Sequence, residues 1–113
     1  MAKKLFDKEK MSEESLALIA KRFKALSEPM RLKIIQTIWH SEMSVQDIVA
    51  KVQTSQVNVS KHLAVLHECG FLKRRKEGLF TFYSVADTSV FTLCDMMCSV
   101  VKDKLNDQIR SFS

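Results

Sequence analysis

Apolar residues recur every three or four positions along most of this chain, the spacing of helices that bury one face. A serine precedes three of these stretches and can cap the helix that follows: Ser12, Ser27 and Ser44. The pattern predicts helices over 13–26, 29–39, 45–52 and 54–67. It also predicts a last helix of about 20 residues, some 30 Å long, beginning at Asp87 or Thr88.

After Gly70 the pattern changes to that of strands. Residues 71–76 and 79–85 are rich in aromatic and β-branched side chains and are separated by Glu77-Gly78, which predicts a β-hairpin. A short helix, a tight connection and a second helix have the order of a helix-turn-helix, and a hairpin directly after it forms a wing. The expected fold class is therefore mainly α (α+β), with about five helices and a two-stranded wing.

The helix over 54–67 has two different faces. Val59, Leu63 and Leu66 follow helical spacing and should point into the core. The opposite face carries amide, hydroxyl and amine groups around Val57, and these groups can contact base edges in the DNA major groove. A solvated polar face is the other interpretation. The residues predicted to contact or support contacts to bases are Ser55, Gln56, Val57, Asn58, Ser60, Lys61 and His62.

The placement of charge favours a DNA-binding role. The chain has a net charge of +5, and residues 51–77 hold six basic and two acidic residues, so this segment carries +4 of it. A basic patch confined to one module is typical of a protein that binds a polyanion. Four consecutive basic residues flank the hairpin tip and are predicted to hold phosphate: Lys73, Arg74, Arg75 and Lys76.

The last predicted helix carries more apolar surface than so small a core can cover. Its heptad-like stripe, widened by neighbouring apolar residues, predicts a homodimer formed through the first and last helices. The predicted interface residues are Leu16, Ile19, Phe23, Val90, Cys94, Met97, Val101 and Leu105. Two-fold symmetry would place the two recognition helices about 34 Å apart, one turn of DNA.

Three runs of the sequence resemble the ArsR/SmtB repressors. Residues 25–35 (ALSEPMRLKII) are similar to the ALADPTRLRIL run of that family, and 55–63 (SQVNVSKHL) with 65–72 (VLHECGFL) to its SQ..VS.HL..L...GL run. The wing resembles the family pattern R.G....Y through 75–78 and Tyr83. The resemblance spans residues 15–101 and implies a winged-helix homodimer that represses transcription from an operator and leaves when an inducer binds.

The metal motifs of that family are missing here. Ser44 and Gln46 stand where the arsenic or cadmium site has its two cysteines. At the zinc site of the last helix, Asp87 is followed by Ser89, and no histidine occurs after His67. The family's two motif-defined metal sites are therefore not expected in this chain.

Cys94 and Cys98 remain as candidate sensors. Four residues apart on a helix, they lie only about 40° apart around its axis, so both thiols share one face. Two thiolates could bind a soft ion such as As(III), Sb(III), Cd(II) or Cu(I), with Cys69 or a partner subunit supplying a third ligand. Packing as small apolar residues and thiol oxidation or persulfide chemistry are the alternatives.

These observations predict a dimeric, sequence-specific repressor that binds double-stranded operator DNA. A winged helix that binds only a protein partner is the alternative. We expect no enzyme, because the chain shows no nucleophile–base arrangement and has only two glycines for a phosphate-binding loop. We expect a flexible N-terminus over 1–11 and one domain over 12–111. Without an apolar run of membrane-spanning length or a signal peptide, we expect a cytoplasmic protein.

Overall fold

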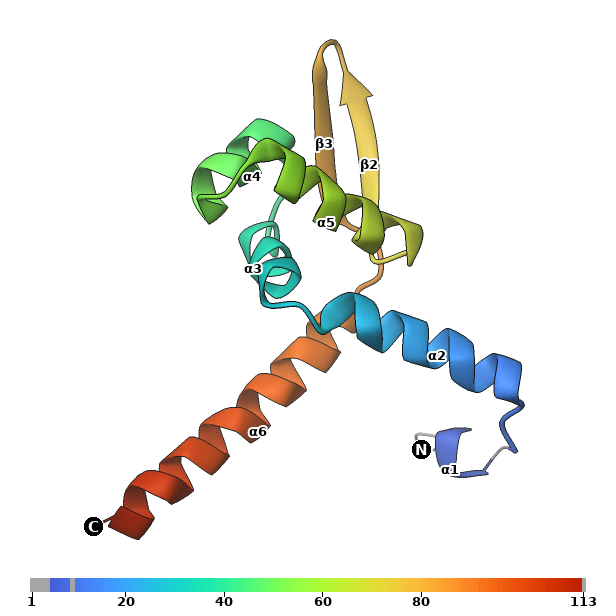
Figure 1. Ribbon diagram of the computed structural model, residues 1–113, viewed down its shortest axis with the longest axis vertical. Helices are drawn as coiled ribbons and strands as arrows, with labels where there is room; N and C mark the ends of the chain where they lie inside the picture. Colours follow the sequence, from blue (N-terminus) through green and yellow to red (C-terminus); the bar gives the residue numbers. More distant parts are fainter. Residues whose placement is uncertain (1–4, 9, 113) are drawn as a thin grey trace.

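The computed structural model describes residues 5–8 and 10–112 of the chain. Its helices are α1 (Leu5–Lys8), α2 (Glu13–Leu26), α3 (Pro29–Thr37), α4 (Val45–Val52), α5 (Gln56–Glu68) and α6 (Ser89–Phe112). Its strands are β1 (Met43–Ser44), β2 (Leu72–Glu77) and β3 (Phe80–Val85). The five predicted helices and the hairpin are confirmed, and α1 and β1 are additional elements. This is the winged helix-turn-helix fold, with β2, β3 and the Gly78-Leu79 loop forming the wing (Figure 1).

Serine hydroxyls define where three helices begin. Ser12, Ser44 and Ser55 each accept a hydrogen bond, 3.1 Å long, from the backbone N–H three residues later. The prediction that Ser27 caps α3 is wrong. Glu28 directly precedes the helix and accepts from the backbone N–H of Met30, whereas the Ser27 hydroxyl donates to the Lys24 carbonyl at the end of α2.

The core lies between α3, α4, α5 and the base of the wing. The predicted inward residues of α5, Val59, Leu63 and Leu66, are all fully buried. They pack in one cluster with the other buried side chains, among them Ile34, Ile35, Ile38, Ile48, Val52, Phe71, Leu72 and Tyr83. This cluster holds the helix-turn-helix and the wing together in one unit.

The sheet has the strand order β1-β3-β2, and both pairings are antiparallel. Strand β1 adds only two pairs, Met43 with Tyr83 and Ser44 with Phe82. A two-residue strand is too short to leave a recognisable sequence pattern, which explains why only a two-stranded wing was expected. The turn of the wing uses Gly78 at a φ of +61°, a conformation that side chains rarely adopt.

Helix α6 extends away from this core, on the side opposite the wing (Figure 1). Val90 is fully buried, Phe91 and Cys94 are half-buried, and residues 95–111 are all exposed. Val90 was predicted at the dimer interface, but it packs inside its own subunit, where a partner cannot reach it. The predicted flexible segment 1–11 contains α1, while its residues 1–4 and 9 lie outside the described part of the chain.

Candidate nucleic-acid interface

The outer face of α5 forms an open hollow on the surface. Gln56, Val57, Ser60, Lys61 and Ala64 line it, and we call these five residues the recognition face. Val57 at its centre is 72% exposed although it is apolar. Amide, hydroxyl and ammonium groups around one exposed valine provide both hydrogen bonds to base edges and a contact for a thymine methyl group.

Three other residues of the predicted recognition set have partners within the chain. The Ser55 hydroxyl caps α5, and the half-buried Asn58 donates from Nδ2 to Thr54 Oγ1 at 3.2 Å. His62 is half-buried, with its Nδ1 3.2 Å from Arg31 Nη1. These contacts hold the first turns of α5 in position, so the three residues support the recognition face from its edges.

Arg31 extends this support to the neighbouring helix. Its Nε donates to the Ala25 carbonyl at 2.6 Å and its Nη2 to the Lys24 carbonyl at 3.2 Å, both at the end of α2. Arg31 therefore ties the side of α5 to α2 through His62. This role leaves no local pattern in the sequence, because the partners lie up to 31 positions apart.

The pleat of β2 separates the four basic wing residues into two pairs. Successive side chains on a strand point to opposite faces, so Arg74 and Lys76 share one face and Lys73 and Arg75 the other. Arg74 is opposite Tyr83, a buried residue whose ring lies 6.4 Å from that of His67 in α5. Arg74 and Lys76 therefore lie on the wing face that packs toward the recognition helix, which the prediction of one basic cluster did not distinguish.

Arg75 is engaged by carboxylates on the other face. Its Nη2 donates to Glu42 at 2.7 Å, its Nη1 pairs with Glu77, and its guanidinium lies 4.7 Å above the ring of Phe82. Hydrogen bonds to Glu42 and then Glu77 raise the pKa of Arg75, and the bond from Arg75 lowers the pKa of Glu42. Since two carboxylates already neutralise it, Arg75 is a poorer candidate for phosphate than Arg74 or Lys76.

Arg22 joins three elements where the recognition helix meets α6. Its Nη1 donates to the carbonyl of Cys69 at 2.6 Å, at the end of α5, and its guanidinium lies 4.3 Å above the ring of Phe71. Its Nη2 donates to Asp87 at 2.5 Å. Asp87 in turn accepts from the backbone N–H of Ser89 at the start of α6. Hydrogen bonds from Ser89 and the charge of Arg22 lower the pKa of Asp87.

The cysteines lie in two different environments. Cys94 and Cys98 both line an apolar groove of about 980 Å³ between α2, α3 and α6, as predicted from their shared helix face. Burial, followed by the charge of Asp95, raises the pKa of Cys94. Cys69 instead packs against the core at the end of α5. Among the residues that the structure describes, no group of three or more Cys, His, Asp or Glu side chains could hold a metal ion.

The described part of the chain contains no helix that is long and apolar enough to cross a bilayer. Comparison with known sequences gives a match to the family described as "Bacterial regulatory protein, arsR family" over residues 28–74. Those residues span α3, α4, α5 and the first half of the wing. The family match therefore covers the elements that form and support the recognition face.

Individual relatives extend this match. A "probable mercury resistance operon repressor" of Streptomyces lividans is 39% identical over 66% of this chain and 59% of its own length. A cadmium resistance regulatory protein homologue of Staphylococcus aureus is 37% identical over 68% and 64%. The chain thus spans less than two thirds of these relatives. The transcriptional activator HlyU of Vibrio cholerae is 30% identical over 82% of both chains.

Solved structures with the same fold cover most of the chain. The Rv0081 protein of Mycobacterium tuberculosis matches with a TM-score of 0.78 at 28% identity, over 87% of this chain and 99% of its own. A homodimeric winged helix-turn-helix DNA-binding domain of Mycobacterium bovis matches with a TM-score of 0.75 at 25% identity, over 86% and 93%. By its sequence and its fold, this chain belongs to the arsR family of bacterial regulatory proteins.

Proposed function

We propose that this protein is a sequence-specific DNA-binding transcriptional repressor that acts as a homodimer in the cytoplasm. The observation that carries the proposal is the recognition face, an open hollow whose five residues combine base-contacting groups with an exposed valine. If this face of α5 were only solvated, there would be no reason for a basic wing to lie beside it. The basic wing therefore favours DNA binding over a solvated polar face.

In this proposal Gln56 and Ser60 donate and accept hydrogen bonds at base edges, Lys61 donates to a base acceptor, and Val57 contacts a thymine methyl group. Arg74 and Lys76 neutralise phosphates from the wing face nearest α5, and Lys73 on the opposite face adds positive charge at the base of the wing. Phosphate contacts fix the position of the protein on DNA, and the contacts of α5 select the sequence.

The proposed dimer forms through α2 and α6. Phe23, Met97, Val101 and Leu105 are large apolar residues on these helices, and each is about half exposed in one chain. Leu16 is exposed and Ile19 half-buried on the same face of α2. A second copy of α6 in the apolar groove would cover this surface. The M. bovis domain, which has the same fold and is homodimeric, supports the proposal that a second copy of this chain fills the groove.

Release by an inducer is the second part of the proposal. Cys94 and Cys98 lie in the groove where the second copy is proposed to pack, so a soft ion such as As(III), Sb(III) or Cd(II) would take its further ligands from the partner subunit. Thiol oxidation or persulfide formation at this pair is the alternative. Either modification would act on the dimer rather than directly on the recognition face.

The proposed function is tested by selection from a pool of random DNA duplexes with the full chain, in a reducing buffer at fixed salt. We expect enrichment of one sequence, bound at least about a thousandfold more tightly than the starting pool. The selected duplex is then titrated with As(III), Cd(II) and polysulfide, in parallel with C94S and C98S. Failure to enrich any sequence would overturn DNA recognition, whereas unaltered binding with every inducer would overturn only the thiol sensor.

A further inference from the structure

The tip of the wing ends in an exposed apolar residue. Leu79 occupies the two-residue loop with Gly78, and it is 97% exposed. Among the described residues, no atom lies within 4 Å of the position where Gly78 would carry a Cβ, so no other described element packs against the loop at this position. A leucine at such a position gains nothing from the fold of its own subunit, because its side chain is as exposed as in an unfolded chain.

The acidic residue next to this tip is neutralised. Glu77 is the only acidic residue of the hairpin, and it pairs with Arg75. Glu77 and Arg75 lie on the same face of β2, and Lys76 lies on the opposite one, toward α5. The tip therefore offers a polyanion a leucine beside Lys76, which forms no ion pair with the described residues.

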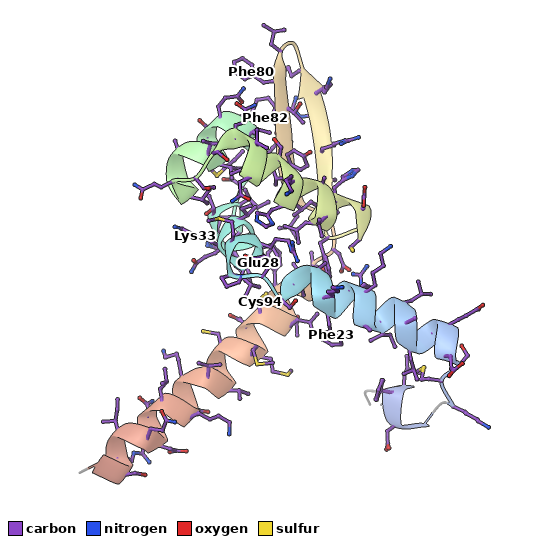
Figure 2. The ribbon with its side chains drawn as sticks, viewed as in Figure 1. Phe23, Glu28, Lys33, Phe80, Phe82 and Cys94 are labelled. Atoms are coloured by element: carbon purple, nitrogen blue, oxygen red, sulfur yellow. The ribbon has the colours of Figure 1, made fainter. Side chains whose placement is uncertain are left out.

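A row of contacts stiffens the hairpin behind the tip. The rings of Phe80 and Phe82 are 6.4 Å apart, and Arg75 covers Phe82 and reaches Glu42 beside β1. Figure 2 shows both phenylalanines on the same side of the wing. A two-stranded hairpin alone is marginally stable in water, and β1 pairs only as far as Phe82. This row holds the tip at a fixed distance from the core.

We propose that Leu79 is an apolar wedge that enters the minor groove of the DNA bound by α5. This inference rests on the proposed function. Six residues of strand extend about 20 Å, and the minor groove adjoining a bound major groove lies about 17 Å away, half of a 34 Å turn. Apolar side chains inserted between base steps partly unstack them and bend the duplex. Lys76 supplies the phosphate contact at the groove edge.

The wedge adds specificity at base pairs that α5 does not contact. Pyrimidine–purine steps such as TA and CA unstack most easily, so the bound sequence should prefer one of them at the position under the wing. The preference comes from deformation of the DNA and needs no hydrogen bond from the wing. It should therefore be lost with the apolar side chain and be retained when a neighbouring charge is removed.

The experiment compares L79A and K76A with the wild type on the selected duplex, which carries 2-aminopurine at the flanking step and a donor–acceptor pair at its ends. We expect L79A to weaken binding about tenfold, with an unchanged salt dependence, a straighter duplex and no flank preference. The control K76A should lower the slope of log K against log salt by about one and keep the bend and the flank preference. Because Leu79 is exposed, both variants should keep the melting temperature of the wild type.

Equal affinity, bend and flank preference for L79A and the wild type would overturn the wedge while leaving the proposed function intact. A loss of affinity in L79A with no change in 2-aminopurine fluorescence would also overturn it and indicate a simple surface contact with the DNA. If the wild type selects no sequence, the proposed function fails and the wedge fails with it.

Discussion

Two regions of this molecule differ in how much of their apolar surface is buried within one chain. One is the recognition half, formed by α3, α4, α5 and the wing, and the other is α6. In the recognition half, α3, α4, α5 and the wing close a core whose central side chains are fully buried. Helix α6 buries Val90, half-buries Phe91 and Cys94, and then continues for almost five turns over 95–111 with its apolar stripe exposed. Both regions show the same sequence pattern, apolar residues at helical spacing, but only one is covered by its own chain.

Assembly is needed where an apolar face stays uncovered in one chain, as it does along α6. A helix whose apolar face stays open in one chain is stabilised mainly when another surface covers it, because isolated helices are marginal in water. The recognition face needs no such cover, since its polar groups are solvated until DNA replaces the water. We therefore expect substitutions in α6 to act on assembly, and substitutions in α5 and the wing to act on DNA binding alone.

The largest effect is expected from V101E. Val101 lines the apolar groove of α6, and a buried carboxylate there would weaken the dimer on the order of a hundredfold or more. Sedimentation equilibrium measures the dissociation constant, and circular dichroism should show the helices intact. N106E adds the same charge to an exposed residue beside the stripe and should dimerise normally. If both variants dimerised equally well, the assignment of α6 to the dimer interface would be wrong.

A smaller effect, confined to DNA, is expected from K61A. Loss of one base contact costs about 1–3 kcal/mol, so affinity for the selected duplex should fall about tenfold or more, with little change for random DNA. Fluorescence anisotropy at fixed salt measures both affinities. The control K104A removes the same charge from α6, and it should match the wild type on both duplexes. If K61A and K104A behave alike, the recognition face is assigned wrongly.

The two faces of the wing should separate in R74A and R75A. We expect R74A to weaken all DNA severalfold and to reduce the salt slope by about one, because Arg74 lies toward α5 without a carboxylate partner among the contacts of the described residues. R75A should leave that slope unchanged, since its charge is already neutralised by Glu42 and Glu77. A titration of affinity against salt concentration distinguishes them. The reverse order of slopes would contradict the assignment of faces.

The smallest effect is expected at the junction of the two regions, in D87N. Asparagine keeps an oxygen for the N–H of Ser89 but loses the charge opposite Arg22, so the free energy of unfolding at pH 7 should fall by about 1 kcal/mol at this partly exposed pair. The pKa of Asp87 is lowered in the fold, so the charged form stabilises the protein above the unfolded pKa of about 3.9.

That contribution is lost as the pH falls through the lowered pKa of Asp87. The wild type and D87N should therefore differ fully at pH 7 and converge below about pH 4. Urea unfolding at one protein concentration across this range measures the difference. A constant difference at every pH would show that the charge of Asp87 contributes nothing.

Local patterns predicted the elements, whereas contacts between distant residues were not predictable. The burial of Val59, Leu63 and Leu66 follows from helical spacing, and the wing from its aromatic strands and glycine turn. The roles of Arg22 and Arg75 depend on carboxylates 65 and 33 positions away, a relation that no local period records. Val90 fits the stripe of α6 equally well as interface or core, and only the position of that helix places it in the core.

Hydroxyl-radical footprinting of the selected duplex examines DNA recognition by α5 and dimerisation through α6 in one measurement. We expect two protected patches on one face of the DNA, centred about one turn or 34 Å apart, each beside a copy of an inverted repeat. With V101E the footprint should weaken at both patches together. A single protected patch on a sequence without a repeat, bound by one chain of the wild type, would rule out a dimeric repressor that reads two half-sites.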